Sequence, residues 1–440
     1  MPSFTRLLVK LFWNNMMTST EKWAEVRLFD IAKCQGGSAF SPSLQGRKSG
    51  ELPFFKVSDM NLPENRWTMH CANNYVNRSD RVHINGSEKP AGSVIFPKVG
   101  AAIFTNKKRL LLQPAFIDNN VMAVWLTSPE RCIPAFLYLH FLTIELSELS
   151  NPGPLPSINN SKIQELTISL PPLSEQERIA AVLWKIQRAI EVEEKLIATA
   201  RELKQSAMRQ LFTKGFRDEP QKASDIGRIP SSWNAVPLGS LGRIGNGSTP
   251  LKTNPAYWEN GTIPWLTSAK VYDVTVRQAD QYVTAKAVQE CHLPRVQPGS
   301  VLMAITGQGK TLGHVAVTAI ETCVSQHIAY IQFNNNQIVP HFVRLFLESR
   351  YDELRGIAQG GGSTKGALTC GFLKTFLIPL PKPDEQARIA SVLLTIEDKA
   401  SVHERRRTML QELFRTMLHQ LMTGEIRVNK LDIDVSEIQP

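Results

Sequence analysis

The chain has 440 residues, of which 42% are hydrophobic and 20% charged, and its formal net charge is +10. This length exceeds what one compact core usually reaches, and the composition excludes a chain that is mostly disordered. No apolar run reaches the ~18 residues needed to cross a bilayer, so we expect no integral membrane protein. The positive charge is typical of a protein with a polyanionic partner.

Six cysteines and nine histidines are spread along the chain without CxxC or metal-ligand spacing. We interpret the cysteines as reduced thiols, which favours a cytoplasmic location, because six widely spread cysteines do not fit a cysteine-dense disulfide scaffold. The same spacing argument predicts no metal site.

Residues 1–173, with a net charge of +5, are predicted to form a first domain that follows a poorly structured leader over residues 1–20. Short β-like runs such as SVIFP (Ser93–Pro97) and a helix-like stretch at 134–149 predict an α+β fold with substantial β-sheet. The basic loops QGRKSG and TNKKR carry the side chains that contact DNA phosphates, although one such loop alone is more often a solvated turn. The DNA-binding candidates of this domain are Arg47, Lys48, Lys107, Lys108 and Arg109.

Residues 174–214 are predicted to form a first spacer helix, which begins shortly after two prolines. Eight of the ten positions on its stripe at 3.5-residue spacing are apolar, and this heptad spacing is typical of a coiled coil. The stripe also contains Glu193. The predicted coiled-coil core residues are Ile179, Leu183, Ile186, Ile190 and Leu211.

Residues 215–383, with a net charge of +5, are predicted to form a second α+β domain. Its β-like runs include SVLMAIT and HVAVTAI, and its polar loops include GNGSTPLKTN, TGQGKT and GGGSTKG. The DNA-binding candidates of this domain are Ser248, Thr249, Lys252, Lys270, Lys310, Thr311 and Lys365.

Residues 384–424 are predicted to form a second spacer helix, because DEQARIASVL repeats SEQERIAAVL 210 residues later. Its stripe contains His403 at the position equivalent to Glu193. Residues 425–440 form a C-terminal tail with a net charge of −2. The predicted core residues of this helix are Ile389, Leu393, Ile396, Leu410, Phe414 and Leu421.

The order domain, helix, domain, helix predicts that the two helices run antiparallel, because a first helix that leads away must be matched by a second that leads back. Helices of roughly 40 residues would each be about 60 Å long, so we expect two similar domains separated by a coiled coil with pseudo-two-fold symmetry. In that arrangement Glu193 and His403 would form a polar pair at the middle of the coil. The alternative is two separate amphipathic helices, each packed on its own domain.

Two segments resemble catalytic loops. AITGQGKT (Ala304–Thr311) is one residue from a phosphate-binding loop, but the LGHVAVTAI that follows predicts a strand where such a loop needs a helix. NPAY (Asn254–Tyr257) resembles the N-P-P-Y loop of amino-methyltransferases, yet no F-x-G-x-G loop accompanies it. We therefore predict no catalytic and no cofactor-binding residue.

Taken together, the motifs resemble the specificity subunit of type I restriction–modification systems. The resemblance rests on LPPLSEQERIAAVL and IPLPKPDEQARIASVL, on DIGRIPSSW before the second domain, and on GGSTKGALT before the second helix. It covers the chain from Trp23 to about Val428. The first half departs from the pattern, because no I-G-x-I-P segment precedes Trp23.

The resemblance implies two target-recognition domains that each bind one half of a split, asymmetric DNA sequence. It further implies that the helices dock two modification (methyltransferase) subunits, that restriction (motor–nuclease) subunits join, and that these partners bind S-adenosylmethionine, ATP and magnesium. Two rivals remain open at this point. One is a DNA methyltransferase or nuclease that acts alone, and the other is a coiled-coil scaffold that binds no nucleic acid.

Overall fold

The computed structural model describes residues 22–84, 86–307, 309–360 and 366–436, so the predicted leader lies outside the described residues. The chain divides into two compact units. Unit 1 comprises Met1–Glu193 and Arg405–Pro440, and unit 2 comprises Glu194–Glu404. Each unit therefore contains one β-rich domain and one half of each long helix.

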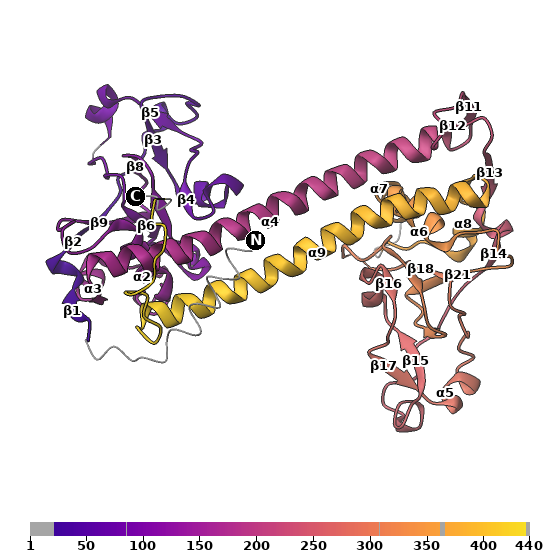
Figure 1. Cartoon of the computed structure of the whole chain (residues 1–440). Helices are drawn as coiled ribbons and strands as arrows, with labels where there is room; N and C mark the ends of the chain where they lie inside the picture. Colours follow the sequence, from indigo (N-terminus) through magenta and orange to yellow (C-terminus); the bar gives the residue numbers. More distant parts are fainter. Residues whose placement is uncertain (1–21, 85, 308, 361–365, 437–440) are drawn as a thin grey trace. The chain divides into compact units, whose positions relative to one another are not determined.

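Unit 1 is built on a five-stranded sheet of order β2-β9-β6-β7-β4 and a three-stranded sheet of order β5-β3-β8 (Figure 1). A separate antiparallel pair, β1 with β10, joins the first and last strands of the domain. The strands are β1 (Ala24–Arg27), β2 (Ala32–Gly36), β3 (Leu52–Phe55), β4 (Thr68–Met69), β5 (Tyr75–Val76), β6 (Val94–Pro97), β7 (Arg109–Leu111), β8 (Phe116–Ile117), β9 (Val121–Leu126) and β10 (Thr167–Leu170), and the short helices are α2 (Pro134–Thr143) and α3 (Asn160–Gln164).

Unit 2 repeats this design with a five-stranded sheet of order β14-β21-β18-β19-β16, a three-stranded sheet of order β17-β15-β20 and the antiparallel pair β13 with β22. A hairpin of β11 and β12 lies in the segment that follows the first long helix. The strands are β11 (Gln221–Ser224), β12 (Gly227–Pro230), β13 (Asn234–Pro237), β14 (Gly242–Asn246), β15 (Ile263–Leu266), β16 (Thr275–Val276), β17 (Gln281–Val283), β18 (Val301–Ala304), β19 (Val315–Thr318), β20 (Cys323–Val324), β21 (Ile328–Phe333) and β22 (Leu377–Leu380), and the short helices are α5 (Ala285–Glu290), α6 (Pro340–Ser349), α7 (Tyr351–Gly360) and α8 (Cys370–Thr375).

The central strands are continuous apolar runs because both of their faces are buried. In β18, Val301 and Met303 belong to the cluster that includes α6, whereas Leu302 and Ala304 belong to a second cluster. This alternation follows from the two-residue period of a strand. The expected α+β fold with substantial sheet is confirmed.

The two long helices are α4 (Leu173–Lys214) and α9 (Pro383–Met422), which agree with the predicted bounds to within two residues. They pack together and run antiparallel. In unit 2, Arg201 of α4 contacts Glu404 of α9 at 2.5 Å, and Lys204, further along α4, contacts Glu397, earlier in α9, at 2.7 Å.

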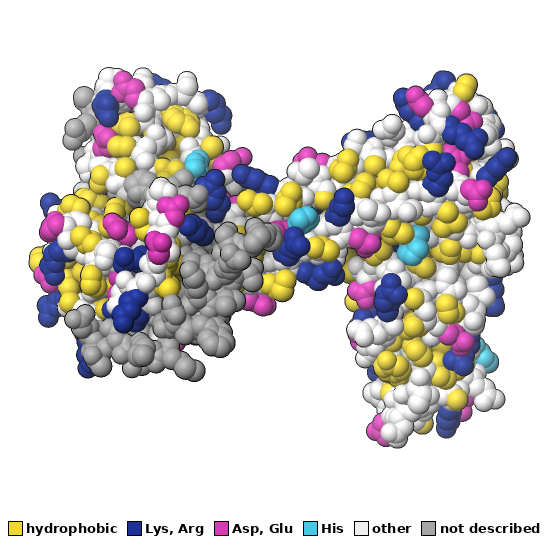
Figure 2. All heavy atoms as spheres, viewed as in Figure 1, with side chains coloured by type: hydrophobic (Ala, Val, Ile, Leu, Met, Phe, Trp, Pro, Cys, Tyr) yellow, Lys and Arg dark blue, Asp and Glu magenta, His cyan; other side chains and the backbone are white. Residues whose placement is uncertain are grey.

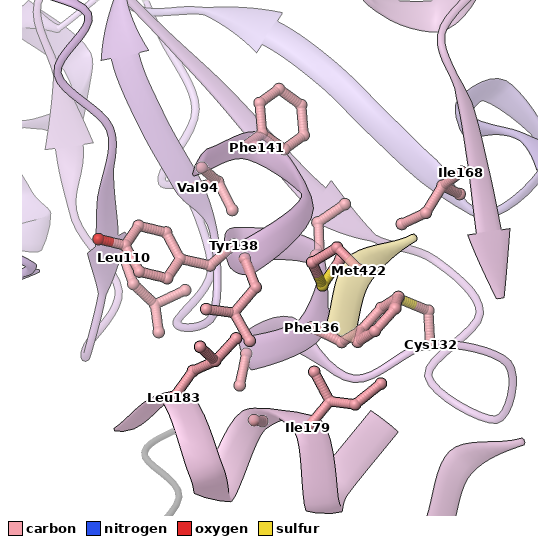
Figure 3. Close-up of a cluster of buried hydrophobic side chains, with 14 of the residues drawn as sticks. Val94, Leu110, Cys132, Phe136, Tyr138, Phe141, Ile168, Ile179, Leu183 and Met422 are labelled. Atoms are coloured by element: carbon pink, nitrogen blue, oxygen red, sulfur yellow. The ribbon is translucent and has the colours of Figure 1, made fainter. Parts of the chain in front are cut away.

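The predicted coiled-coil residues take part in two interfaces, because they pack on the adjoining domain as well as on the other long helix. In unit 1, Ile179 and Leu183 of α4 point toward the α2 side chains (Figure 3) and share one buried cluster with them. Ile389 and Leu393 of α9 do the same with α6 in unit 2. The alternatives of a coiled coil and of helices packed on their own domains are thus both partly realised. The other predicted core residues that are buried are Ile186, Ile190, Phe414 and Leu421, and the half-buried ones are Leu211, Ile396 and Leu410.

The repeated Glu-Gln dipeptide anchors the start of each long helix. The Gln176 side chain accepts a hydrogen bond from the amide of Ile133, which precedes α2, and Gln386 accepts one from Val339, which precedes α6. Each glutamine therefore fixes its long helix to the short helix of the domain. Both glutamines are buried, where a polar side chain needs such partners.

The neighbouring glutamates hold the segments that follow the long helices. Glu175, 1% exposed, accepts hydrogen bonds from the Nε and Nη2 atoms of Arg427 at 2.8 and 2.7 Å and from the Val428 amide. Its repeat, Glu385, accepts hydrogen bonds from the indole of Trp233 and the amide of Phe216. Arg427 and Val428 of the C-terminal tail are thereby attached to the start of α4.

Unit 2 contains an ion network in which the buried Arg344 is joined with the partly buried Lys204, Glu348 and Glu397. The guanidinium of Arg344, which is 2% exposed, lies 2.6 Å from Glu397, and the Lys204 ammonium lies 2.7 Å from the same carboxylate. Burial raises the pKa of Glu397, but the attraction of Arg344 and Lys204 outweighs this effect, so the pKa lies below its usual value.

The positions of unit 1 that correspond to Arg344, Glu397 and Lys204 are neutral, namely Tyr138, Gln187 and Phe414. The Tyr138 hydroxyl and the Gln187 Oε1 atom are buried without a hydrogen-bond partner among the residues that the structure describes. The two units thus share a fold but differ in how their short helix is joined to the long helices.

Within the described ranges, no helix is long and apolar enough to cross a membrane.

Candidate nucleic-acid interface

Three loops of unit 2 are joined by a chain of side-chain hydrogen bonds. The Thr249 hydroxyl, after β14, donates to Oε1 of Gln326, which lies between β20 and β21. The amide nitrogen of Gln326 lies 3.3 Å from Nε2 of His327. The Nδ1 atom of His327 lies 2.5 Å from the hydroxyl of Thr306, in the loop after β18. We call Thr249, Gln326, His327 and Thr306 the polar chain.

The polar chain joins three segments, of which two were predicted as polar loops from the sequence and the third was not. Thr249 and the 306–311 loop belong to predicted polar loops, whereas Gln326 and His327 sit in the turn SQH between two strands. Both side chains are exposed. Their amide and imidazole groups are of the kind that read base edges. No periodicity or motif marks this turn, so only the strand pairing revealed it.

The glycine that precedes Ser248 is required by a close approach of two backbones. A β-carbon on Gly247 would lie 1.6 Å from the carbonyl oxygen of Val324, and one on Gly37 would lie 2.1 Å from that of Ile117. Only glycine fits such contacts. The repeated Gly-Ser dipeptide therefore brings two turns close to a neighbouring strand. In unit 1 the turn after β2 lies against the end of β8, and in unit 2 the turn after β14 lies against the end of β20.

The loop that carries Lys310 and Thr311 is braced by aromatic side chains. The His314 ring lies between those of Tyr272 and Tyr351, with centroid distances of 4.7 and 4.8 Å. The Tyr351 hydroxyl donates to the backbone carbonyl of Lys310 at 2.6 Å, and the Tyr272 hydroxyl lies 3.0 Å from that of Thr311. The Lys310 side chain is left exposed. This loop leads into β19, as the sequence predicted, and not into a helix.

The other candidates of unit 2 contact protein groups. The Lys252 ammonium lies 3.7 Å from the centre of the Trp258 ring and donates to Gln281, and the Ser248 hydroxyl donates to the Cys291 carbonyl. Lys270 lies 2.9 Å from Asp280, whose hydrogen bond raises the pKa of the lysine. Lys365 lies outside the described residues.

In unit 1 the surface candidates are Arg47, Lys48 and Lys107. The Arg47 guanidinium lies 2.7 Å from Asp80, Lys107 donates to Asn61, and Lys48 is exposed. These side chains come from two separate loops. Within the described residues, no hydrogen-bond network connects these three side chains in the way that the polar chain connects the loops of unit 2.

Two candidates of unit 1 have to be corrected. Lys108 is 2% exposed, and its ammonium donates to the Ile144 carbonyl and to Asn106. Burial lowers the pKa of Lys108 to about 8. Arg109, in β7, is buried and donates to the backbone carbonyls of Asn65, Lys108 and Met60. Because these cations serve as internal donors, we do not retain them as DNA contacts.

A polar group in unit 1, formed around Lys89, was not predicted from the sequence. The Lys89 ammonium is buried and donates to Oε1 of Gln35 at 2.6 Å and to the Ser87 hydroxyl at 3.0 Å. Burial lowers the pKa of Lys89 to about 8. The Ser87 hydroxyl also donates to Oε1 of Gln35. Both contacts use the oxygen of the Gln35 amide, so they fix its orientation and leave its nitrogen as the atom that they do not use. In unit 2, Gly245 occupies the position of Gln35.

Comparison with known proteins now decides the family. The family described as Type I restriction modification DNA specificity domain matches this chain twice, over residues 20–202 and 230–412. The chain belongs to this family of type I restriction–modification specificity subunits. The double match coincides with the internal repeat.

Among curated specificity subunits, the chain is similar to the type I restriction enzyme MjaIX specificity subunit of Methanocaldococcus jannaschii, with 30% identity over 46% of this chain and 47% of that protein. It is also similar to the EcoBI specificity subunit of Escherichia coli, with 20% identity over 88% of this chain and 82% of that protein. The matches to three M. jannaschii relatives span 47%, 62% and 66% of those proteins' own length.

The fold has been seen in a solved specificity subunit. The crystal structure of the S subunit of a type I restriction–modification system from M. genitalium matches with a TM-score of 0.61 and 15% identity, over 92% of this chain and 98% of that one. This likeness shows a common fold.

Proposed function

We propose that this specificity subunit reads an asymmetric, bipartite DNA site, with one half contacted by unit 1 and the other by unit 2. The observation that carries the proposal is the repetition of one sheet topology with different side chains at equivalent loop positions. Between β8 and β9 the chain reads Asp118-Asn119-Asn120, and between β20 and β21 it reads Ser325-Gln326-His327. The same scaffold with different polar groups suits two unlike half-sites.

The net charge of each domain supports a polyanionic ligand. Each domain carries a net charge of +5. On the face drawn in Figure 2, the Lys and Arg side chains are scattered among apolar and neutral ones. This distribution suits several separate phosphate contacts, which position a protein on DNA, with sequence read by other groups.

The long helices supply surfaces for the modification and restriction subunits. Leu196 and Leu203, one heptad apart on α4, are 41% and 55% exposed. Apolar side chains are also visible along the long helices in Figure 2. Exposed apolar side chains that recur on one helix face are typical of docking surfaces. We place methylation, cleavage and the cofactors S-adenosylmethionine, ATP and magnesium on those partners in the cytoplasm, with no catalytic group on this chain.

The test is to assemble the subunit with its modification subunits and to map methylated bases in a random-sequence DNA library. We expect one motif with two unlike halves separated by a gap of fixed length. Binding measured by fluorescence anisotropy should weaken steeply with salt, because phosphate contacts release counterions. A single uninterrupted motif, or affinity that does not depend on salt, would contradict the proposal.

A further inference from the structure

We propose that Gln326 is a specificity-determining residue of unit 2 and that it reads an adenine base. This inference rests on the proposed DNA recognition and adds to it the residue and the base. The Gln326 side chain makes hydrogen bonds to Thr249 and His327 and keeps part of its hydrogen-bonding capacity.

The polar chain assigns a role to each atom of the Gln326 amide. Thr249 donates to Oε1, and one N–H of the amide faces Nε2 of His327 at 3.3 Å. Because an amide nitrogen can only donate, Nε2 of His327 is the acceptor in this contact, and the other ring nitrogen, Nδ1, lies 2.5 Å from the Thr306 hydroxyl. A glutamine amide has two N–H donors and an oxygen with two lone pairs. Among the residues that the structure describes, one donor and one lone pair of this amide therefore remain without a partner.

One donor beside one acceptor is the pattern that adenine complements. In the major groove adenine offers N7 as an acceptor and its N6 amino group as a donor. Guanine offers two acceptors, so its O6 would face the lone pair of Gln326. Cytosine offers only a donor and thymine an acceptor beside a methyl group. The remaining hydrogen-bonding capacity of Gln326 thus favours adenine over the other three bases.

The surrounding residues hold the amide before any DNA is bound. Thr249 follows Gly247, whose backbone lies against Val324 at the end of β20, so both ends of the Thr249–Gln326 contact are fixed by one strand. Thr306 is tied down as well, because it forms an isolated bridge with Ala367. A side chain that is ordered in the free protein loses less conformational entropy when it binds.

Lys310 provides a contrast within the same surface. Its loop begins at Thr306, a member of the polar chain, and its exposed ammonium lacks the donor-and-acceptor pattern of an amide. A lysine that contacts phosphate strengthens binding to every sequence, whereas a base-reading glutamine strengthens binding to some sequences only. The two residues should therefore give different signatures in one assay.

The experiment uses the full chain assembled with its modification subunits and the random-library methylation map described above. Gln326→Ala is expected to reduce discrimination for adenine at one position of one half-site by ~10- to 100-fold and to leave the other half-site unchanged. Gln326→Glu should shift the preference at that position toward cytosine, whose amino group a carboxylate accepts. Thr249→Val should give a smaller loss at the same position.

Two variants serve as controls. Gln289→Ala removes an exposed glutamine from α5 in the same unit and should leave the motif unchanged. Lys310→Ala should weaken binding to all sequences alike and lower the salt slope by about 1.

An unchanged motif for Gln326→Ala, or methylation reduced evenly at all sites, would overturn the assignment while the wild-type bipartite motif upheld the proposed function. Absence of salt-dependent DNA binding by the wild-type complex would overturn both.

Discussion

The ion network around the buried Arg344 in unit 2 leads to a quantitative prediction for Glu397→Gln. The substitution keeps the shape of the side chain and gives unit 2 the residue, glutamine, that unit 1 has at the equivalent position 187. It also removes the charge that faces Arg344 at 2.6 Å and Lys204 at 2.7 Å. Two cations are then left close together with less compensation.

Breaking a buried ion pair by removing one partner costs about 3 to 5 kcal/mol. The loss should be smaller here, because Arg344 keeps Glu348 at 3.1 Å and the new amide oxygen can still accept a hydrogen bond. We expect about 2 to 3 kcal/mol of lost stability in unit 2. The triple change Lys204→Phe, Arg344→Tyr and Glu397→Gln copies the neutral residues of unit 1 and should regain most of that loss.

The pH dependence of this loss has a definite sign. The pKa of Glu397 is lower in the folded protein than its ordinary value of 4.5, so the charged carboxylate stabilises the fold above about pH 4.5. This contribution disappears as the pH falls through the folded pKa. The difference between wild type and Glu397→Gln should therefore be full at pH 7 and shrink on acidification below pH 4.5.

The assay is hydrogen–deuterium exchange, which reports on α6 (Pro340–Ser349) and on its counterpart α2 separately. Protection should fall in α6 and stay constant in α2. Glu404→Gln is the matched control, because its ion pair with Arg201 is exposed and should contribute less than about 1 kcal/mol. Equal protection of α6 in wild type and Glu397→Gln, or a triple variant that is less stable than the single one, would refute the reasoning.

Three further predictions follow from single contacts. Glu175→Gln should weaken the attachment of the tail at Arg427 by about 3 kcal/mol of free energy. Faster proteolysis of residues 427–433 would show this loss, whereas unaltered cleavage would speak against the contact. The folded pKa of Lys89 is about 8 and its ordinary value is 10.5, so the unfolded chain binds more protons between these pH values and stability should rise there by about 3 kcal/mol. Lys89→Met should remove this increment in denaturation curves at pH 8 and 10.5, and an unchanged slope would exclude the burial effect. Gly247→Ala should destabilise unit 2 by about 3 kcal/mol or more in thermal unfolding, because its β-carbon would overlap a carbonyl, whereas Gly309→Ala meets no atom within 4 Å and should be tolerated.

The elements with a strong period could be predicted from the sequence. Both long helices were placed to within two residues, because their apolar stripes continue without a glycine or proline break. The same stripe could not show that Ile179 and Leu183 face α2 as well as the neighbouring long helix. A heptad pattern reports which face is apolar and does not identify what covers it.

The candidate site was predictable only in its loops. TNKKR was interpreted as a loop that contacts DNA, but its arginine begins β7 and its second lysine donates to a backbone carbonyl, so both are buried. Gln326 and His327 were missed because they meet Thr249 and Thr306 through strand pairing across long sequence separations. Local patterns describe the turn that carries a side chain and not the partner that orients it.

In each unit the first and last strands of the domain are hydrogen-bonded neighbours, β1 with β10 and β13 with β22. The chain thus enters and leaves either domain at one place, directly before the helix that follows. A replacement of all residues between such a strand pair would exchange one β-rich domain and would leave both long helices intact. Under the function that we propose, such an exchange would alter one half of the DNA site and leave the helix surfaces that dock the partner subunits unchanged.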